Sequence, residues 1–263
     1  MINKLVILTI LIATSCLISC KKKRDKQSEE QISISSTADQ SSNNDSLLNS
    51  VSGNVTMKQI STFPNKVILT GLNDHRLVSI YKSRTTTSST GNLKRSSYSY
   101  DSDESGDESS EHFMPGIDIL FGYNLLNIAH YDLKLETGNF LFNHPVLVKT
   151  LYFPSFTQDS LDNQPINRNY YLVSVYDEDT NKDSLINKRD LRRFYHFDAS
   201  CKMKKQLLPA AYSVVRSQYD SKNDIMYIFA RHDENQNGTE DKSESVHIFW
   251  FSLKTPDTAK LLY

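Results

Sequence analysis

The sequence predicts an all-β protein, and three observations lead to this fold class. Short apolar runs rich in Val, Ile, Tyr and Phe alternate with turn-forming residues over most of the chain. After residue 20, no amphipathic stretch with the 3.6-residue period of a helix exceeds about two turns. The third observation is a weak internal repeat, because a shift of 54 residues aligns residues 172–208 with residues 226–262 without a gap.

The apolar runs indicate the strands in order along the chain. They occupy residues 66–72, 76–82, 117–123, 126–133, 170–176, 192–198, 225–231 and 246–253. Asn73-Asp74 and Tyr123-Asn124 provide turn residues between neighbouring runs. We therefore expect strands that are connected by hairpins.

The repeat predicts how these strands are grouped. Each unit reads as a strand, a long loop, a second strand, a turn and a short strand, and a further strand precedes each unit at residues 146–153 and 212–218. Four strands in about 50 residues is the size of a β-propeller blade. The pattern resembles propeller repeats most closely in the last third, whereas residues 57–100 and 112–142 fit more loosely. It predicts about four blade-like units in a closed or incomplete propeller; a β-sandwich and a ring completed by a homo-oligomer are the alternatives.

The composition excludes several classes of protein. The chain has 263 residues and a formal net charge of −1, so it lacks the excess positive charge of nucleic-acid-binding proteins. Of its three cysteines only Cys201 lies beyond residue 20, which excludes a disulfide framework, and we interpret it as a lone thiol near a turn. The seven histidines are scattered, and there is no zinc-type cluster, nucleophile elbow, P-loop or dinucleotide-binding motif. An enzyme is therefore the less favoured interpretation.

The N-terminus reads as a processed leader. It contains Lys4, an apolar run over residues 5–12 and the tetrapeptide Leu17-Ile18-Ser19-Cys20, and it is too short to span a bilayer before the charges begin at Lys21. The tetrapeptide resembles the lipobox of bacterial lipoproteins. The resemblance implies a signal peptide over residues 1–19 and acylation of Cys20 with chains such as palmitate. Cys16 ends a weaker second candidate.

The implied acylation has consequences for localisation. Two or more acyl chains on Cys20 give stable membrane anchoring of a domain that folds in water. In Gram-negative lipoproteins, Asp after the acylated cysteine is the usual inner-membrane retention signal, whereas this chain has Lys21. By this analogy the chain is an outer-membrane lipoprotein of the bacterial cell envelope, facing the periplasm or the exterior.

Two polar segments flank or interrupt the predicted domain, which spans residues 56–263. Residues 20–55 carry the lipidated cysteine and then Ser, Asn, Gln, Asp, Glu and Lys without aromatic residues, which predicts a disordered tether. Residues 84–111 are rich in Ser and Thr and end in a series of acidic residues. We expect a disordered insertion there, either a solvated loop or an acidic patch for calcium or a partner.

The two long loops of the repeat contain the most specific functional motif of the sequence. Residues 233–244 match the calcium-loop pattern D-x-[DN]-x-[DN]-G-x5-E, and residues 179–190 match it except for Ser184 in place of Gly and Asp190 in place of Glu. Calcium prefers six to eight oxygen ligands, which such a loop supplies from alternate side chains, one backbone carbonyl and a final carboxylate. Exposed hairpin turns use the same residue types, so the alternative interpretation is that these loops are ordinary turns that bind no metal.

These loops resemble those of EF-hand and dockerin proteins. The resemblance assigns one ligand set to each loop. The first set is Asp179, Asn181, Asp183, Leu185 through its carbonyl, Asn187 and Asp190. The second set is Asp233, Asn235, Asn237, Thr239 through its carbonyl, Asp241 and Glu244. Because the flanks are strand-like, the closer likeness is to calcium loops on β-hairpins of propeller domains such as those of integrin α chains. Calcium is then expected to stabilise the hairpins.

These features together predict a non-enzymatic, lipid-anchored envelope protein. Its calcium-stabilised β domain would present a binding surface to a protein or a glycan, without a nucleic-acid partner. The alternative function is a hydrolase or lyase that acts on envelope or extracellular polysaccharide on the same scaffold. A cleft that gathers carboxylates or a histidine away from the calcium loops would favour this alternative.

Overall fold

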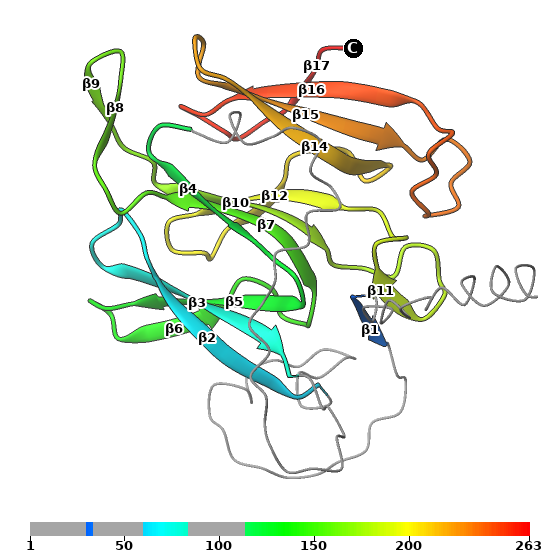
Figure 1. Ribbon diagram of the computed structural model, residues 1–263, viewed down its shortest axis with the longest axis horizontal. Helices are drawn as coiled ribbons and strands as arrows, with labels where there is room; N and C mark the ends of the chain where they lie inside the picture. Colours follow the sequence, from blue (N-terminus) through cyan, green and yellow to red (C-terminus); the bar gives the residue numbers. More distant parts are fainter. Residues whose placement is uncertain (1–29, 34–59, 84–113) are drawn as a thin grey trace, which may run out of the picture.

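A computed structural model describes residues 30–33, 60–83 and 114–263, and these residues form an all-β structure (Figure 1). Within these ranges every regular element is a strand, and no helix is long and apolar enough to cross a membrane. The predicted signal peptide, Cys16, Cys20, the insertion over residues 84–111 and most of the predicted tether lie outside the described residues. The all-β prediction is confirmed.

Three antiparallel sheets make up most of the structure. The first sheet has the strand order β2-β3-β5-β6, formed by β2 (Thr62–Leu69), β3 (His75–Lys82), β5 (Leu125–Asp132) and β6 (Thr137–Phe140). The second has the order β13-β12-β10-β7-β4, formed by β13 (Lys204–Gln206), β12 (Arg193–Asp198), β10 (Tyr170–Tyr176), β7 (Leu147–Pro154) and β4 (Ile117–Phe121). The third has the order β14-β15-β16-β17, formed by β14 (Tyr212–Asp220), β15 (Ile225–His232), β16 (Val246–Ser252) and β17 (Lys260–Leu261).

Two small sheets complete the described structure. One pairs β1 (Gln31–Ser33) with β11 (Leu185–Asn187), and the other pairs β8 (Asp159–Leu161) with β9 (Gln164–Ile166). All eight strands predicted from the apolar runs are present, and each deviates by only a few residues at its ends. The additional strands are mostly two to four residues long, too short for a periodic pattern to reveal them.

The three large sheets are stacked as layers, with the second sheet in the middle (Figure 1). All seven residues of β10 are buried, because the strand has a sheet on each side. Its side chains alternate between two cores. Tyr171, Val173 and Val175 belong to the core shared with the first sheet, and Tyr170 and Leu172 belong to the core shared with the third.

The internal repeat corresponds to the second and third sheets. In the second, β7, β10, β12 and β13 follow one another as an antiparallel meander, and β14 to β17 do the same in the third. A shift of 54 residues places β10 on β15 and β12 on β16. The added strand β4 pairs with the open edge of β7.

The predicted number of about four units is wrong for the described residues, which hold three such meanders. Residues 57–100 and 112–142 were expected to form two loose units, yet β2 and β3 combine with β5 and β6 into the first sheet through the pairing of β3 with β5, and β4 joins the second sheet. A two-stranded hairpin is marginal by itself, so β2 and β3 gain stability from this pairing. No described sheet closes on itself, and an arrangement as propeller blades stays a prediction.

The tether prediction is wrong at residues 30–33. The strand β1 pairs with β11, and Ile32 is fully buried in a small core with Leu126, Leu147 and Ile186. The alternation of Ile32 and Ile34 with polar residues is too short to predict a strand, whereas the tertiary structure buries Ile32 against apolar side chains that are distant in sequence. The segment therefore joins the fold instead of remaining a plain linker.

Candidate functional site

The two predicted calcium loops lie at equivalent places in the repeat and contact each other. Residues 179–190 connect β10 to β12, with β11 inside the loop, and residues 233–244 connect β15 to β16. An isolated antiparallel bridge joins Asp190 to Thr239. The amide of Glu240 donates to the carbonyl of Arg189 at 3.0 Å, and the Thr180 hydroxyl donates to the carbonyl of Gly238 at 2.5 Å. The loops therefore form one paired unit.

The first half of loop 179–190 is folded around its own side-chain oxygens. Asp179 accepts the amides of Asp183 at 3.1 Å and Ser184 at 2.8 Å. Asn181 Oδ1 also accepts the amide of Asp183 at 3.1 Å, and Asp183 Oδ1 accepts the amide of Leu185 at 2.9 Å. The side chains at loop positions 1, 3 and 5 therefore all turn toward the inside of the loop.

The loop over residues 233–244 has the same hydrogen-bond pattern. Asp233 accepts the amides of Asn237 at 3.1 Å and Gly238 at 3.0 Å. Asn235 Oδ1 accepts the amide of Asn237 at 2.9 Å, and Asn237 Oδ1 accepts the amide of Thr239 at 2.7 Å. Each of these bonds has its counterpart 54 residues earlier, so the two loops share one conformation and not only one motif.

The backbone angles agree with this equivalence. Position 4 has a positive φ in both loops, at Lys182 (61°) and Gln236 (56°), and so does position 6, at Ser184 (67°) and Gly238 (70°). Such angles favour glycine, so Ser184 adopts this conformation at some cost. At Gly238 a Cβ would lie 2.0 Å from the carbonyl oxygen of Thr180, so the contact between the loops itself requires glycine.

The final acidic residues of the two loops differ in their surroundings. Asp190 is fully buried, and its oxygens accept the amides of Thr180 and Asn187, both at 2.8 Å. Burial raises the pKa of its carboxyl group, although these hydrogen bonds oppose the shift. Glu244 accepts the amide of Glu234 at 3.1 Å through Oε1. Its Oε2 is buried and has no hydrogen-bond partner among the described residues.

The predicted side-chain ligands at positions 1, 3, 5, 9 and 12 all accept amides of their own loop. At position 9, Asn187 accepts the amide of Arg189 and Asp241 accepts the amide of Ser243, so both cap a following turn. Within the described residues, no group of three or more His, Cys, Asp and Glu side chains is placed to hold a metal ion. Thr180, which the motif does not single out, joins the loops.

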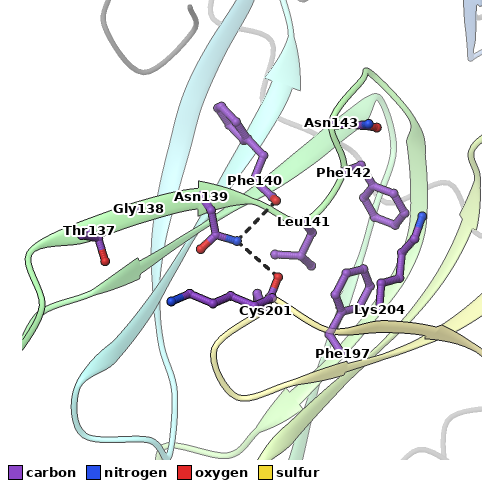
Figure 2. Close-up of a pocket in the computed structure, with 11 residues that line it drawn as sticks. Thr137, Gly138, Asn139, Phe140, Leu141, Phe142, Asn143, Phe197, Cys201 and Lys204 are labelled. Atoms are coloured by element: carbon purple, nitrogen blue, oxygen red, sulfur yellow. Dashed lines mark hydrogen bonds between the residues drawn. The ribbon is translucent and has the colours of Figure 1, made fainter. Parts of the chain in front are cut away.

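A separate surface hollow of about 540 Å³ lies between the β5–β6 hairpin of the first sheet and the turn before β13 (Figure 2). Its floor consists of the buried residues Leu141, Phe142, Phe197 and Cys201. Exposed residues surround the floor. They are Thr137, Gly138, Asn143, Lys202 and Lys204. The sequence did not point to this hollow, because its walls come from segments about 60 residues apart.

Asn139 fixes the two walls of the hollow to each other. Its Nδ2 donates to the carbonyl oxygens of Phe140 at 3.4 Å and Cys201 at 3.3 Å (Figure 2), and its Oδ1 lies 3.2 Å from Nδ1 of His130. Cys201 has a φ of 55° in the turn, and burial raises the pKa of its thiol. Cys201 is therefore a free, buried cysteine in a turn, in agreement with its interpretation as a lone thiol near a turn.

Comparison with known proteins identifies no relative of this chain: no protein-family model matches it, and no curated protein matches its sequence.

Proposed function

We propose that this chain is a lipid-anchored protein of the bacterial cell envelope whose all-β, propeller-like domain binds calcium and presents a surface to a partner. The observation that carries the proposal is the shared conformation of the paired loops 179–190 and 233–244. Calcium acts as a structural ion in this proposal, and the domain functions by binding rather than by catalysis.

The chemistry of the loops fits a hard cation. The side-chain oxygens at positions 1, 3 and 5 accept backbone amides within each loop, and calcium is bound by oxygen atoms of this kind. The unpartnered Oε2 of Glu244 is a further oxygen that a cation would satisfy. The residues that would hold the ions are those predicted above for each loop.

The position of the loops supports a structural role for the ion. Loop 179–190 is joined to β1 through β11, and it is joined to loop 233–244 through the bridge between Asp190 and Thr239. Ions in both loops would therefore stabilise the connections among the second sheet, the third sheet and β1. Extracellular calcium modules bind at about 10⁻⁴ to 10⁻³ M, which suits three carboxylates per loop.

Calcium binding can be tested by thermal unfolding of the protein with calcium, with magnesium and with excess chelator. We expect calcium alone to raise Tm, with about 1.4 kcal/mol of stabilisation for each occupied loop at tenfold excess over Kd. The Asp179→Ala plus Asp233→Ala variant should lose the calcium-dependent rise. Asp220→Ala is the matched control, because Asp220 accepts the amides of Lys222 and Asn223 in a turn outside the loops. Coincident curves for the unchanged protein at millimolar calcium would contradict the proposal.

The lipid anchor requires a separate test in intact bacteria. When the full chain is expressed in a Gram-negative host, we expect it in the outer-membrane fraction with incorporated palmitate. Cys20→Ser should remove both properties, whereas Cys16→Ser should leave them unchanged. Palmitate incorporation that depends on Cys16 instead would move the cleavage site, and a protein without lipid in either background would refute the anchor.

A further inference from the structure

We propose that the hollow between the β5–β6 hairpin and the turn before β13 is a binding site for an acidic sugar, with a uronate unit as the recognised group. This inference rests on the proposed role as a binding protein and specifies the chemistry of its ligand. None of its lining residues belongs to the calcium loops, and its walls belong to the first and second sheets.

The shape of the hollow suits a ligand of one or a few sugar rings. Its volume of about 540 Å³ lies within the usual range of small-molecule sites. Leu141, Phe142 and Phe197 form the floor but are only 6%, 2% and 1% exposed, so a ligand would contact mainly the rim of the hollow. The hydroxyl group of Thr137 and the amide nitrogen of Asn143 are polar groups at its edge.

The charge around the hollow is complementary to a carboxylate. Two cationic side chains, Lys202 and Lys204, line it, and none of its eleven lining residues is acidic. Lys204 Nζ lies 5.1 Å from the ring centre of Phe142 and 4.5 Å from that of Tyr195. No described carboxylate forms an ion pair with either lysine. The Lys202 ammonium is therefore available to an anionic ligand, whereas the Lys204 ammonium already contacts the two rings and acts on the buried Asp177.

Asp198, the carboxylate nearest in sequence to the two lysines, already accepts hydrogen bonds from its own turn. Asp198 Oδ1 accepts the amides of Lys202 and Met203, both at 2.9 Å, and its Oδ2 accepts the Ser200 hydroxyl at 2.5 Å. These bonds shape the turn that carries Cys201 and Lys202. Asn139, which also lines the hollow, uses its side chain to join this turn to β6 and so holds the walls in place. The site is therefore formed before a ligand arrives.

The binding experiment uses the full chain and isothermal titration calorimetry. The probes are galacturonate, α-1,4-linked trigalacturonate and a neutral galactose trimer. We expect trigalacturonate to bind, and the neutral trimer to bind at least about tenfold more weakly, because it lacks the carboxylates. Binding of galacturonate itself would assign recognition to a single unit, and binding of the trimer alone would assign it to an extended chain.

Variants at the hollow separate specific recognition from general charge attraction. Lys202→Glu plus Lys204→Glu should abolish binding of trigalacturonate, and Thr137→Trp should obstruct the exposed rim without entering the core. Lys205→Glu is the matched control on the same strand, because Lys205 Nζ instead lies 3.4 Å from the Thr258 hydroxyl. It should bind like the unchanged protein, and the Tm of each variant checks that it is folded.

The outcomes that overturn the inference are distinct from those that overturn calcium binding. Equal binding of the neutral trimer, an equal loss in the Lys205→Glu variant, or no binding of either uronate by the folded protein would refute the acidic-sugar site. The calcium-dependent change in Tm is measured in the same samples without sugar. A protein that shows this change and ignores uronates retains the proposed function but not this ligand.

Discussion

At the scale of single residues, a buried ion pair joins two sheets. Arg168, just before β10, donates to both carboxylate oxygens of Asp224, at 3.0 and 2.7 Å. The same guanidinium donates to the carbonyls of Leu253 and Pro115. Both side chains are 2% exposed. Because the pair is fully hydrogen-bonded, its charges are compensated in spite of burial.

Removing one partner of this ion pair should lower the free energy of unfolding. We expect Asp224→Asn to lower the free energy of unfolding by about 3–5 kcal/mol, because it leaves a buried guanidinium without its counter-charge. Combining it with Arg168→Met should cost less than the sum of the single changes. Urea denaturation measures both. Arg189→Gln is the control, since its exposed pair with Asp183 at 3.8 Å contributes at most about 1 kcal/mol. A loss that small for Asp224→Asn would contradict the argument.

His130 makes stability depend on pH. It is 2% exposed, its Nε2 lies 2.9 Å from Nδ1 of His75, and burial lowers its pKa from the ordinary 6.5. His75, which is also cationic when protonated, further lowers this pKa, and Asn139, Asp132 and Asp198 oppose the shift. As pH falls below about 6.5, the unfolded imidazole takes up a proton before the folded one does. The free energy of unfolding should therefore fall as the solution becomes more acidic.

The variant His130→Gln should remove this part of the pH dependence. Chemical denaturation at about pH 7.5 and about pH 5 gives the difference between variant and unchanged protein at each pH. We expect the variant to be relatively more stable at pH 5 than at pH 7.5. An unchanged difference at the two values would show that His130 does not titrate in this window.

At the scale of elements, β1 is a short strand that depends on its tertiary contacts. A three-residue pairing with β11 is too small to persist alone. Ile32 is buried in its small core, and Lys82 Nζ donates to the carbonyl of Gln31 at 2.8 Å. Glu30 forms an ion pair with Lys149 at 3.1 Å and accepts the amide of Asn124 at 2.5 Å. This strand connects the N-terminal region directly to the first candidate calcium loop.

Weakening β1 should therefore loosen that loop. In Ile32→Ala, we expect faster hydrogen exchange at the amides of β11, because burial of the isoleucine side chain provides much of the docking energy. Exchange in β16 should stay the same. Ser33→Ala changes an exposed residue of the same strand and serves as the control. If exchange in β11 is equal in both variants, β1 does not support the loop.

At the scale of the whole molecule, the second sheet connects the other two. Leu172 and Val173 are adjacent on β10, and both are fully buried, one in the core shared with the third sheet and the other in the core shared with the first. Each outer sheet therefore has its apolar face covered only by the middle one among the described elements. Such an arrangement favours a single cooperative unit.

This predicts one unfolding transition that responds to either core. Leu172→Ala should lower the free energy of unfolding by about 2–5 kcal/mol, and Val173→Ala by less, since it removes fewer carbon atoms. Both variants should shift the same calorimetric transition. Two separate transitions, each moved by only one of the variants, would show that the sheets unfold independently.

The sequence predicted much of this fold, because β-rich runs and turn residues are local signals. The eight main strands and the repeat that relates the second and third sheets were visible in it, as were the loop motifs. It did not reveal the ion pair of Arg168 with Asp224 or the hollow beside β6. Their partners lie 56 and about 60 residues apart, and nothing in either local pattern marks them.

By itself, then, the sequence determined the all-β class, the places of the long strands and the pattern of oxygen-bearing residues in loops 179–190 and 233–244. Only the tertiary structure decided that the two loops contact each other, that β4 joins the second sheet, and that Ile32 anchors a strand within a polar segment. The physical reason is that strand and turn preferences act over a few neighbouring residues. Sheet order and buried partners instead depend on which distant apolar surfaces fit together in three dimensions.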